Sequence, residues 1–180
     1  MKKPMVRLPV TLLTVALIIS LLLGLVNAVT KDKIAENLVV KTQESIQAVM
    51  PEADRFEHID YTGSNGVTEV LSAMSGSEAL GYVVKITVPG SQDYISLIVG
   101  VSMDYKVTGV SIVDQSETAG LGGKADSPEF LSQYIGKEYG ITLGGGDNSI
   151  DAITAATITS SAVTSGVNYA IEAAKEASGS

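Results

Sequence analysis

Residues 81–113 have the sequence GYVVKITVPGSQDYISLIVGVSMDYKVTGVSIV and contain three runs in which apolar and polar or small residues alternate. The run 81–88 stops at Pro89-Gly90, the run 94–101 repeats its pattern, and a short turn leads into 107–113. Alternation places every second side chain on a core, and short turns join neighbouring strands antiparallel. We predict two or three antiparallel strands, whose core-facing residues in the first two runs are Tyr82, Val84, Ile86, Val88, Ile95, Leu97, Val99 and Val101.

Helical patterns follow these strands. A loop with three glycines, 116–124, precedes a short helix that Ser127-Pro128-Glu129 opens and Gly136 ends. Apolar residues then recur at helical spacing over 159–177, where Thr159 or Ser160 could serve as N-cap. Strands that precede helices in this way predict an α+β fold, an antiparallel sheet packed with helices.

Two shorter features lie between these helices. Gly144 to Asp147 is predicted to be a turn, and residues 150–153 a short strand. The strand leads into the final helix through small residues.

The N-terminus carries a long apolar segment. Lys2, Lys3 and Arg7 precede residues 8–29, which contain no charged residue and span about 33 Å as a helix, enough for a membrane core of about 30 Å. The basic residues place the N-terminus in the cytoplasm. We predict a single-pass helix of the cell membrane with the remaining chain on the extracytoplasmic side. A cleaved signal peptide is the alternative. A pilin-type assembly helix is a third interpretation, but such helices have an acidic residue early in the apolar segment, and residues 8–29 contain none.

The region between this segment and the strands divides into two parts. Residues 31–50 are charged and compatible with a helix that continues outward as a stalk until Pro51. Residues 52–77 have weak periodicity and predict an irregular connection with at most short strands. His58, which lies there, is expected to be a surface or structural residue. The predicted organisation is a cytoplasmic N-terminus (1–7), a membrane helix (8–29), a stalk and connection (30–78) and one folded domain (79–180).

Composition excludes several kinds of chemistry. The chain has 180 residues, one His and no Cys, so thiolate metal sites, cysteine-ligated iron–sulfur clusters and c-type haem are impossible. A formal charge of -8 and a pI near 4.6 make nucleic acid an unlikely partner. Redox chemistry in this chain would need an organic cofactor.

Residues 151–160, Asp-Ala-Ile-Thr-Ala-Ala-Thr-Ile-Thr-Ser, are the segment where chemistry could occur. A strand runs there into a helix N-terminus through small residues, and the free N–H groups of such a terminus favour an anion such as phosphate. The simpler interpretation is a helix start rich in candidate caps. The residue pattern leaves both possibilities open.

The same segment resembles a known motif. Asp-x-x-Thr-(Gly/Ala)-Ala-Thr followed by Ile-Thr-Ser is similar to the flavinylation motif of the FMN-binding domain in the G subunits of Rnf electron-transport complexes and the C subunits of sodium-pumping NADH:quinone reductases. Glu117-Thr118-Ala119-Gly120-Leu121-Gly122 with Lys124 resembles the Glu-Thr-Pro-Gly-Leu-Gly loop of that domain. The chain departs from the usual pattern at Ala155 in place of Gly and at Ala119 in place of Pro.

The resemblance implies a membrane-anchored flavoprotein electron carrier, a redox subunit that is not an enzyme on its own. FMN would be attached through its phosphate to the Thr157 hydroxyl by a flavin transferase that uses FAD and recognises Asp151, Thr154 and Ala156. Partners would be the other subunits of an Rnf-type ferredoxin:NAD⁺ oxidoreductase coupled to Na⁺ or H⁺ transport, and membrane lipid around one helix. The remaining residues that the resemblance implies to bind the cofactor are Glu117, Thr118, Gly120, Leu121, Gly122 and Lys124, of which the loop 118–122 would orient the flavin.

The residues agree with an external transferase, because a Thr hydroxyl is a weak nucleophile and no patterned base lies near Thr157 in the sequence. The C subunit of a sodium-pumping quinone reductase is the alternative within the same chemistry, but that protein is longer. Two other classes remain: an exported module that binds a phosphate-bearing ligand without redox chemistry, and a structural surface protein.

Overall fold

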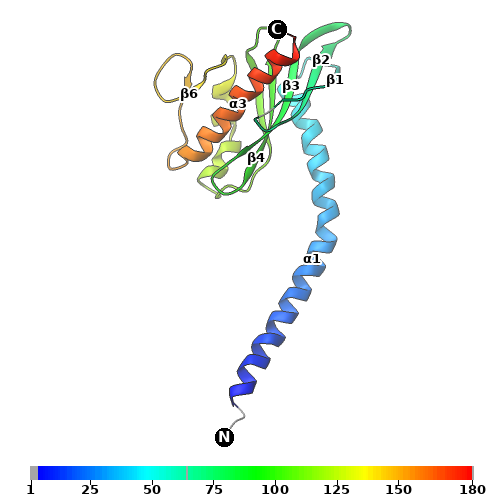
Figure 1. Cartoon of the computed structure of the whole chain (residues 1–180), viewed down its shortest axis with the longest axis vertical. Helices are drawn as coiled ribbons and strands as arrows, with labels where there is room; N and C mark the ends of the chain where they lie inside the picture. The colour runs from blue at the N-terminus through cyan, green and yellow to red at the C-terminus, as the bar shows by residue number, and fades with distance from the viewer. Residues whose placement is uncertain (1–3, 64, 180) are drawn as a thin grey trace. The chain divides into compact units, whose positions relative to one another are not determined.

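The computed structural model describes residues 4–63 and 65–179, so Lys2 and Lys3, predicted to mark the cytoplasmic end, lie outside it. Two compact units meet in the chain between Val40 and Lys41. The N-terminal unit is part of one long helix, and the C-terminal unit contains the sheet and the shorter helices (Figure 1).

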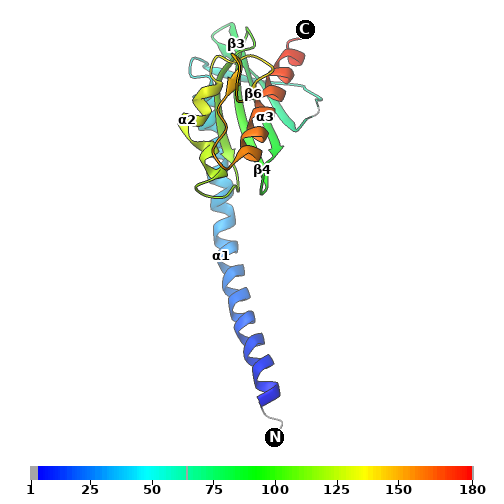
Figure 2. The ribbon, with the colours of Figure 1, turned by 90° about the vertical axis from the view of Figure 1, so that its left-hand side faces the viewer.

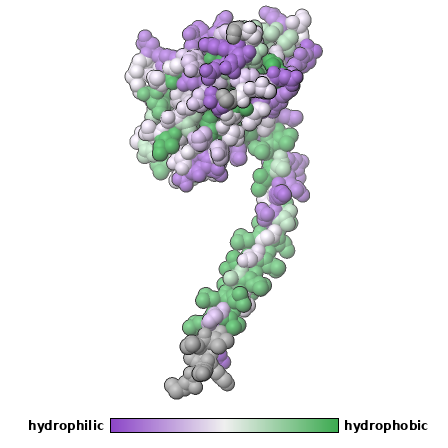
Figure 3. Space-filling view, in the orientation of Figure 1, coloured by the Kyte–Doolittle hydropathy of each residue, from purple (hydrophilic) through white to green (hydrophobic). Residues whose placement is uncertain are grey.

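Helix α1, Pro4–Val49, joins the predicted membrane segment and the predicted stalk in one uninterrupted helix. It is the one helix among the described residues that is long and apolar enough to cross a membrane, with a mean hydropathy of 2.6 over its most apolar window. The apolar side chains of 8–29 are exposed, and Figure 3 shows them as a green column. The hydroxyls of Thr11 and Thr14 donate to the carbonyl oxygens four residues earlier, which satisfies them inside an apolar segment.

The sheet has five antiparallel strands in sequential order: three in the region 81–113, as predicted, and two more from residues 55–75. Residues 52–77 were expected to form an irregular connection with at most short strands; β1 is short, but the nine-residue β2 shows that this prediction was wrong. Periodicity failed there for two reasons: β1 is a mostly exposed edge strand, and β2 buries the consecutive residues Val70 and Leu71 on opposite faces. The strands are β1 (Arg55–Ile59), β2 (Val67–Ser75), β3 (Glu78–Pro89), β4 (Tyr94–Ser102) and β5 (Val107–Asp114).

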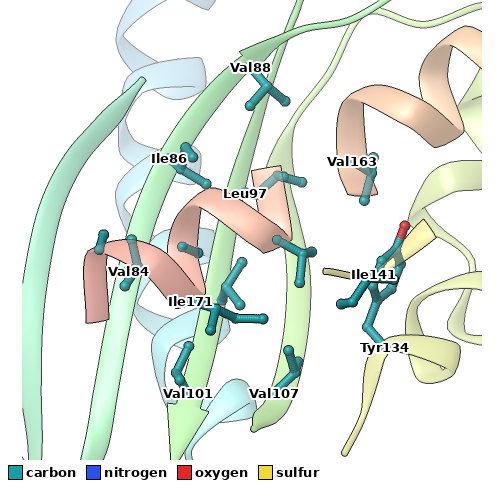
Figure 4. Close-up of a cluster of buried hydrophobic side chains, with 14 of the residues drawn as sticks. Val84, Ile86, Val88, Leu97, Val101, Val107, Tyr134, Ile141, Val163 and Ile171 are labelled. Atoms are coloured by element: carbon teal, nitrogen blue, oxygen red, sulfur yellow. The ribbon is translucent and has the colours of Figure 1, made fainter. Parts of the chain in front are cut away.

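One face of the sheet packs against helix α3, Thr157–Ala177, as Figures 1 and 2 show. The alternating residues predicted to face the core are all buried, and Figure 4 shows several of them beside Val163 and Ile171 of α3. The α+β architecture predicted from the sequence is therefore confirmed.

The other face packs against the end of α1. Gly100 and Gly109 are paired across β4 and β5, and a Cβ would lie 2.5 Å from the Val49 carbonyl oxygen at Gly100 and 3.0 Å from the Val49 Cα at Gly109. The Thr108 hydroxyl donates to the Val49 carbonyl at 2.7 Å, and Ser111 donates to the Ser45 hydroxyl at 2.9 Å. Burial on this second face explains why residues such as Val83 and Ile98, out of phase with the α3 face, are also inaccessible.

Short elements connect β5 to α3. A 3₁₀ turn (Gly122–Asp126) leads to α2 (Pro128–Leu131), which begins where predicted and has Ser127 as its N-cap, and to a second 3₁₀ turn (Ser132–Tyr134). The strand predicted at 150–153 is shorter, since β7 (Ser149–Ile150) pairs in parallel only with β6 (Thr142–Leu143).

Candidate functional site

Thr157 is the first residue of α3, and its side chain is exposed. The predicted cap at Thr159 or Ser160 was wrong: Ala156 is the N-cap, and no side chain caps it. The first N–H groups of a helix have no partners within the helix and carry its positive dipole end. An uncapped start therefore offers N–H groups to an anion beside the Thr157 hydroxyl.

Side chains from elsewhere in the chain hold the segment before Thr157. Gln133 accepts a hydrogen bond from the Asp151 N–H at 2.8 Å. The buried Ser160 hydroxyl accepts from the Ile153 N–H at 2.9 Å and donates to the Ala156 carbonyl at 3.0 Å. These bonds occupy backbone groups that a longer strand would use, which explains why β7 ends at Ile150.

Ala155 occupies the tightest point of this segment. Its φ of 62° is in the left-handed region, where a side chain costs about 1 kcal/mol and glycine is free of strain. The glycine of the motif that this segment resembles would suit the same backbone. The alanine keeps the turn at that cost.

The hydroxyl groups near the start of α3 differ in their exposure to solvent. The Thr159 side chain is 1% exposed and donates to Oε2 of Glu117, and Ser160 is fully buried. Thr157 and Thr154 remain exposed. Among the hydroxyls of the first turn of α3, Thr157 is the one that a reagent from outside can reach.

Glu117 joins three separate segments. Its Oε1 accepts from the N–H groups of Ser91 and Gln92 at 2.8 and 2.9 Å, in the turn between β3 and β4, while Oε2 accepts from Thr159. The carboxylate fits because Gly90 and Gly122 lack side chains: a Cβ would lie 2.5 Å from Oε1 at Gly90 and 2.6 Å from Oε2 at Gly122.

The environment of Glu117 keeps it ionised. Burial alone would raise the pKa of the carboxyl, but the N–H of Gln92, the hydroxyl of Thr159 and the N–H of Ser91 donate to it and hold its pKa below the ordinary value. Glu117 is therefore a fixed negative charge at neutral pH.

Thr157 borders two hollows. One is a cleft of about 440 Å³ between the glycine-rich loop and the start of α3, and we call it the loop cleft. The other is an apolar groove of about 480 Å³ along α3, lined by Val88, Pro89, Ala162 and Tyr169 among others. Ile158, 65% exposed, lines both. The loop cleft is lined by Ser91, Gln92, Glu117, Thr118, Leu121, Gly122, Ala155, Ala156, Thr157, Ile158 and Thr159.

The structure thus brings together six of the ten residues selected from the sequence: Glu117, Thr118, Leu121, Gly122, Ala156 and Thr157. Three others line a separate hollow of about 560 Å³ beside α2, which contains Lys124, Asp151 and Thr154. Gly120 has a φ of 78° and lines neither; it serves the turn itself.

Sequence reasoning missed Ser91, Gln92 and Thr159. The turn at 90–93 was recognisable from Pro89-Gly90, but nothing in the sequence places it beside residue 117. Thr159 was considered as a cap, although its hydroxyl serves Glu117. Gln133 was also missed, because its role depends on the second 3₁₀ turn, Ser132–Tyr134, lying against the segment before Thr157.

Known proteins resemble the chain in sequence and in fold. The RnfG N-terminal region matches residues 1–49, and the FMN-binding domain family matches residues 90–172. The G subunit of the Na⁺-translocating ferredoxin:NAD⁺ oxidoreductase complex of Acetobacterium woodii is 32% identical, over 94% of this chain and 91% of its own. The corresponding protein of the proton-translocating complex of Clostridium ljungdahlii is 33% identical, over 89% and 86%.

A solved structure has the same fold. The C subunit of the Na⁺-translocating NADH-quinone reductase of Parabacteroides distasonis superposes with a TM-score of 0.54 at 21% identity, over 62% of this chain and 63% of its own. At that identity the likeness concerns the fold alone.

Proposed function

The chain belongs to the family of G subunits of Rnf-type ion-translocating oxidoreductase complexes, and from this premise we propose that it carries electrons through FMN bound covalently at Thr157. Membership supports the coarser statement that it is a membrane flavoprotein of such a complex. The attachment residue, the transferase, the coupling ion and the membrane orientation are parts of the proposal.

The observation that carries the proposal is the position of Thr157. Its hydroxyl is exposed at an uncapped helix start, while Thr159 and Ser160 are buried and engaged in hydrogen bonds. A phosphoester at this residue would place phosphate oxygens beside the free N–H groups of the first turn, which favour an anion. The residues present therefore fit a phosphate-linked group.

The charge of the site favours a covalent link over ionic retention. No Lys or Arg is among the described residues that line the loop cleft or the groove along α3. Backbone N–H groups alone would have to hold the phosphate of a free FMN in a strongly acidic chain. A bond to Thr157 removes that requirement.

Apolar side chains beside Thr157 could contact a flavin ring. Leu121 is 44% exposed at the loop cleft, and Ile158 is exposed between the cleft and the groove. FMN supplies the redox chemistry when bound, and the protein supplies position and electrostatics. The loop 117–122 is held by hydrogen bonds of the Leu121 and Gly123 N–H groups to the Thr118 carbonyl, so its apolar side chain is presented from a closed turn.

Attachment is proposed to need a separate flavin transferase with FAD as donor. A Thr hydroxyl reacts only when a base or metal activates it. Glu117 lines the same cleft, but its oxygens already accept from Ser91, Gln92 and Thr159, and its pKa lies below the ordinary value. It is therefore a poor base for Thr157. Asp151 and Thr154, exposed beside α2, are proposed to be recognised by the transferase.

In the proposed setting α1 anchors the protein in the cell membrane with its N-terminus in the cytoplasm, and the flavin domain is extracytoplasmic. The electrons pass between the ferredoxin and NAD⁺ sides of the complex through its other subunits. The relatives are named for both Na⁺ and protons, so the coupling ion of this chain is either one. The match of the RnfG N-terminal region favours an Rnf-type complex over a sodium-pumping quinone reductase.

The test uses the full chain coexpressed with a flavin transferase, denatured and separated by electrophoresis. The wild-type band should fluoresce as flavin, and Thr157→Ala should not, while Ser161→Ala, which removes another exposed hydroxyl of the same helix, should fluoresce like the wild type. A dark wild-type band would contradict the proposal. A fluorescent Thr157→Ala band would show that the flavin is attached to another residue.

A further inference from the structure

Glu117 was selected as a residue that contacts a cofactor, but its surroundings in the structure indicate a different role. A carboxylate has about four acceptor positions. Ser91, Gln92 and Thr159 occupy three of them. Little acceptor capacity is left for a bound group.

The segments that meet at this carboxylate are far apart in the sequence. The 90–93 turn and the first turn of α3 both donate to the side chain of a residue from the loop 117–122. The turn also has a backbone bond of its own, from the Gly90 N–H to the Asp93 carbonyl at 2.8 Å. All three segments line the loop cleft beside Thr157.

The two glycines at the carboxylate let the backbone approach it closely. Any Cβ at Gly90 or Gly122 would lie within 2.6 Å of a Glu117 oxygen. The three hydrogen bonds hold the carboxylate, and with it the charge, in the space that the missing side chains leave.

We propose that Glu117 is a positioning residue: its carboxylate joins the 90–93 turn, the loop 117–122 and the start of α3 into a preformed wall of the loop cleft, and its fixed negative charge lowers the reduction potential of a flavin at Thr157. The second part rests on the proposed function. Reduction adds negative charge to the flavin, and a nearby anion disfavours that change. The first part concerns the protein without its cofactor.

Two substitutions separate charge from shape. Glu117→Gln keeps a carbonyl oxygen for Ser91 and Gln92 and an amide toward the Thr159 hydroxyl, but it removes the charge. Glu117→Asp keeps the charge and withdraws it from the donors by one methylene. The matched control is Asp104→Asn, an exposed carboxylate in the β4–β5 turn. It lies beyond the opposite end of β4 from Gln92, about 27 Å along the strand, well outside the screening length of about 8 Å.

The potential of the bound flavin is measured by spectroelectrochemistry on the full, flavinylated chain in detergent. We expect Glu117→Gln to raise the equilibrium constant for reduction about tenfold, which is about 30 mV for a two-electron couple, and Asp104→Asn to leave it unchanged. Equal potentials in both variants would overturn the electrostatic role. A wild-type chain that never acquires flavin would instead contradict the proposed function, so the two failures are distinguishable.

The preformed wall is tested without flavin by hydrogen exchange of the full chain. The amides of Ser91 and Gln92 should be protected in the wild type and in Glu117→Gln, and should exchange at least tenfold faster in Glu117→Asp. Protection that is the same in all three proteins would show that the carboxylate does not hold the turn and would overturn the positioning role.

Discussion

Gly122→Ala should destabilise the C-terminal unit by breaking the contact between Glu117 and α3. The new Cβ would lie 2.6 Å from Oε2 of Glu117 and 2.7 Å from Oγ1 of Thr159, so the hydrogen bond between these atoms cannot persist. A hydrogen bond to a charged group contributes about 1.5–3 kcal/mol, and overpacking costs about 1–3 kcal/mol. Because relaxation relieves part of both, we expect a loss of about 2–4 kcal/mol in the free energy of unfolding.

The adjacent Gly123→Ala is the matched control. Its nearest contact would be the Thr118 carbonyl oxygen, at 3.3 Å, which a small shift relieves. A change within about 1 kcal/mol of wild type is expected there, since alanine also restricts the unfolded chain.

The assay is thermal unfolding of the full chain in detergent, followed by circular dichroism. A loss of about 2–4 kcal/mol corresponds to a midpoint lowered by about 6–16 °C for a domain of this size. If Gly122→Ala and Gly123→Ala unfold at the same temperature, the Glu117 carboxylate is not closely packed and does not form a fixed wall of the loop cleft.

Three further predictions use the same unfolding assay. Gly100→Ala would place a Cβ against Thr108 Oγ1 and 2.5 Å from the Val49 carbonyl oxygen that this hydroxyl donates to, and we expect a loss of about 1–3 kcal/mol; an unchanged midpoint would contradict this contact between the end of α1 and the sheet. Ile171→Ala removes a fully buried side chain and should cost about 2–5 kcal/mol, with a loss under about 1 kcal/mol as the contrary result. Burial and the Glu176 carboxylate raise the pKa of Tyr61 from 10.0 to about 12, so its contribution to stability is present below pH 10 and is lost as pH rises toward 12. Tyr61→Phe should remove that part of the pH dependence, and identical slopes in both proteins would refute it.

The central strands were predictable because their periodicity survives in the structure. Val84, Ile86, Leu97 and Val99 face α3 as their alternation indicated. Residues 67–75 were missed since Val70 and Leu71 are both buried, one on each face, and two-sided burial removes alternation. The second covering layer, the end of α1, is apolar in only a few positions, so its packing on the sheet leaves little trace in the sequence.

The candidate site was predictable where a motif was local. Residues 151–157 lead into the start of α3, as their small residues suggested, and side chains of Gln133 and Ser160 hold the segment by hydrogen bonds. The hydrogen bonds of Glu117 could not be predicted, because its partners lie in a turn 25 residues earlier and in a helix 42 residues later. The sequence also did not show that Asp151 and Thr154 line a different hollow from Thr157, because these residues are close neighbours in the chain.

The most direct test of the central claim is mass spectrometry of peptides from the full chain coexpressed with a flavin transferase. The peptide that contains residues 151–160 should gain the mass of one FMN less one water, and fragmentation should place it on Thr157. The same peptide from Thr157→Ala should carry no added mass. FMN found on Thr154 or Thr159, or on no residue of the wild-type peptide, would contradict the account.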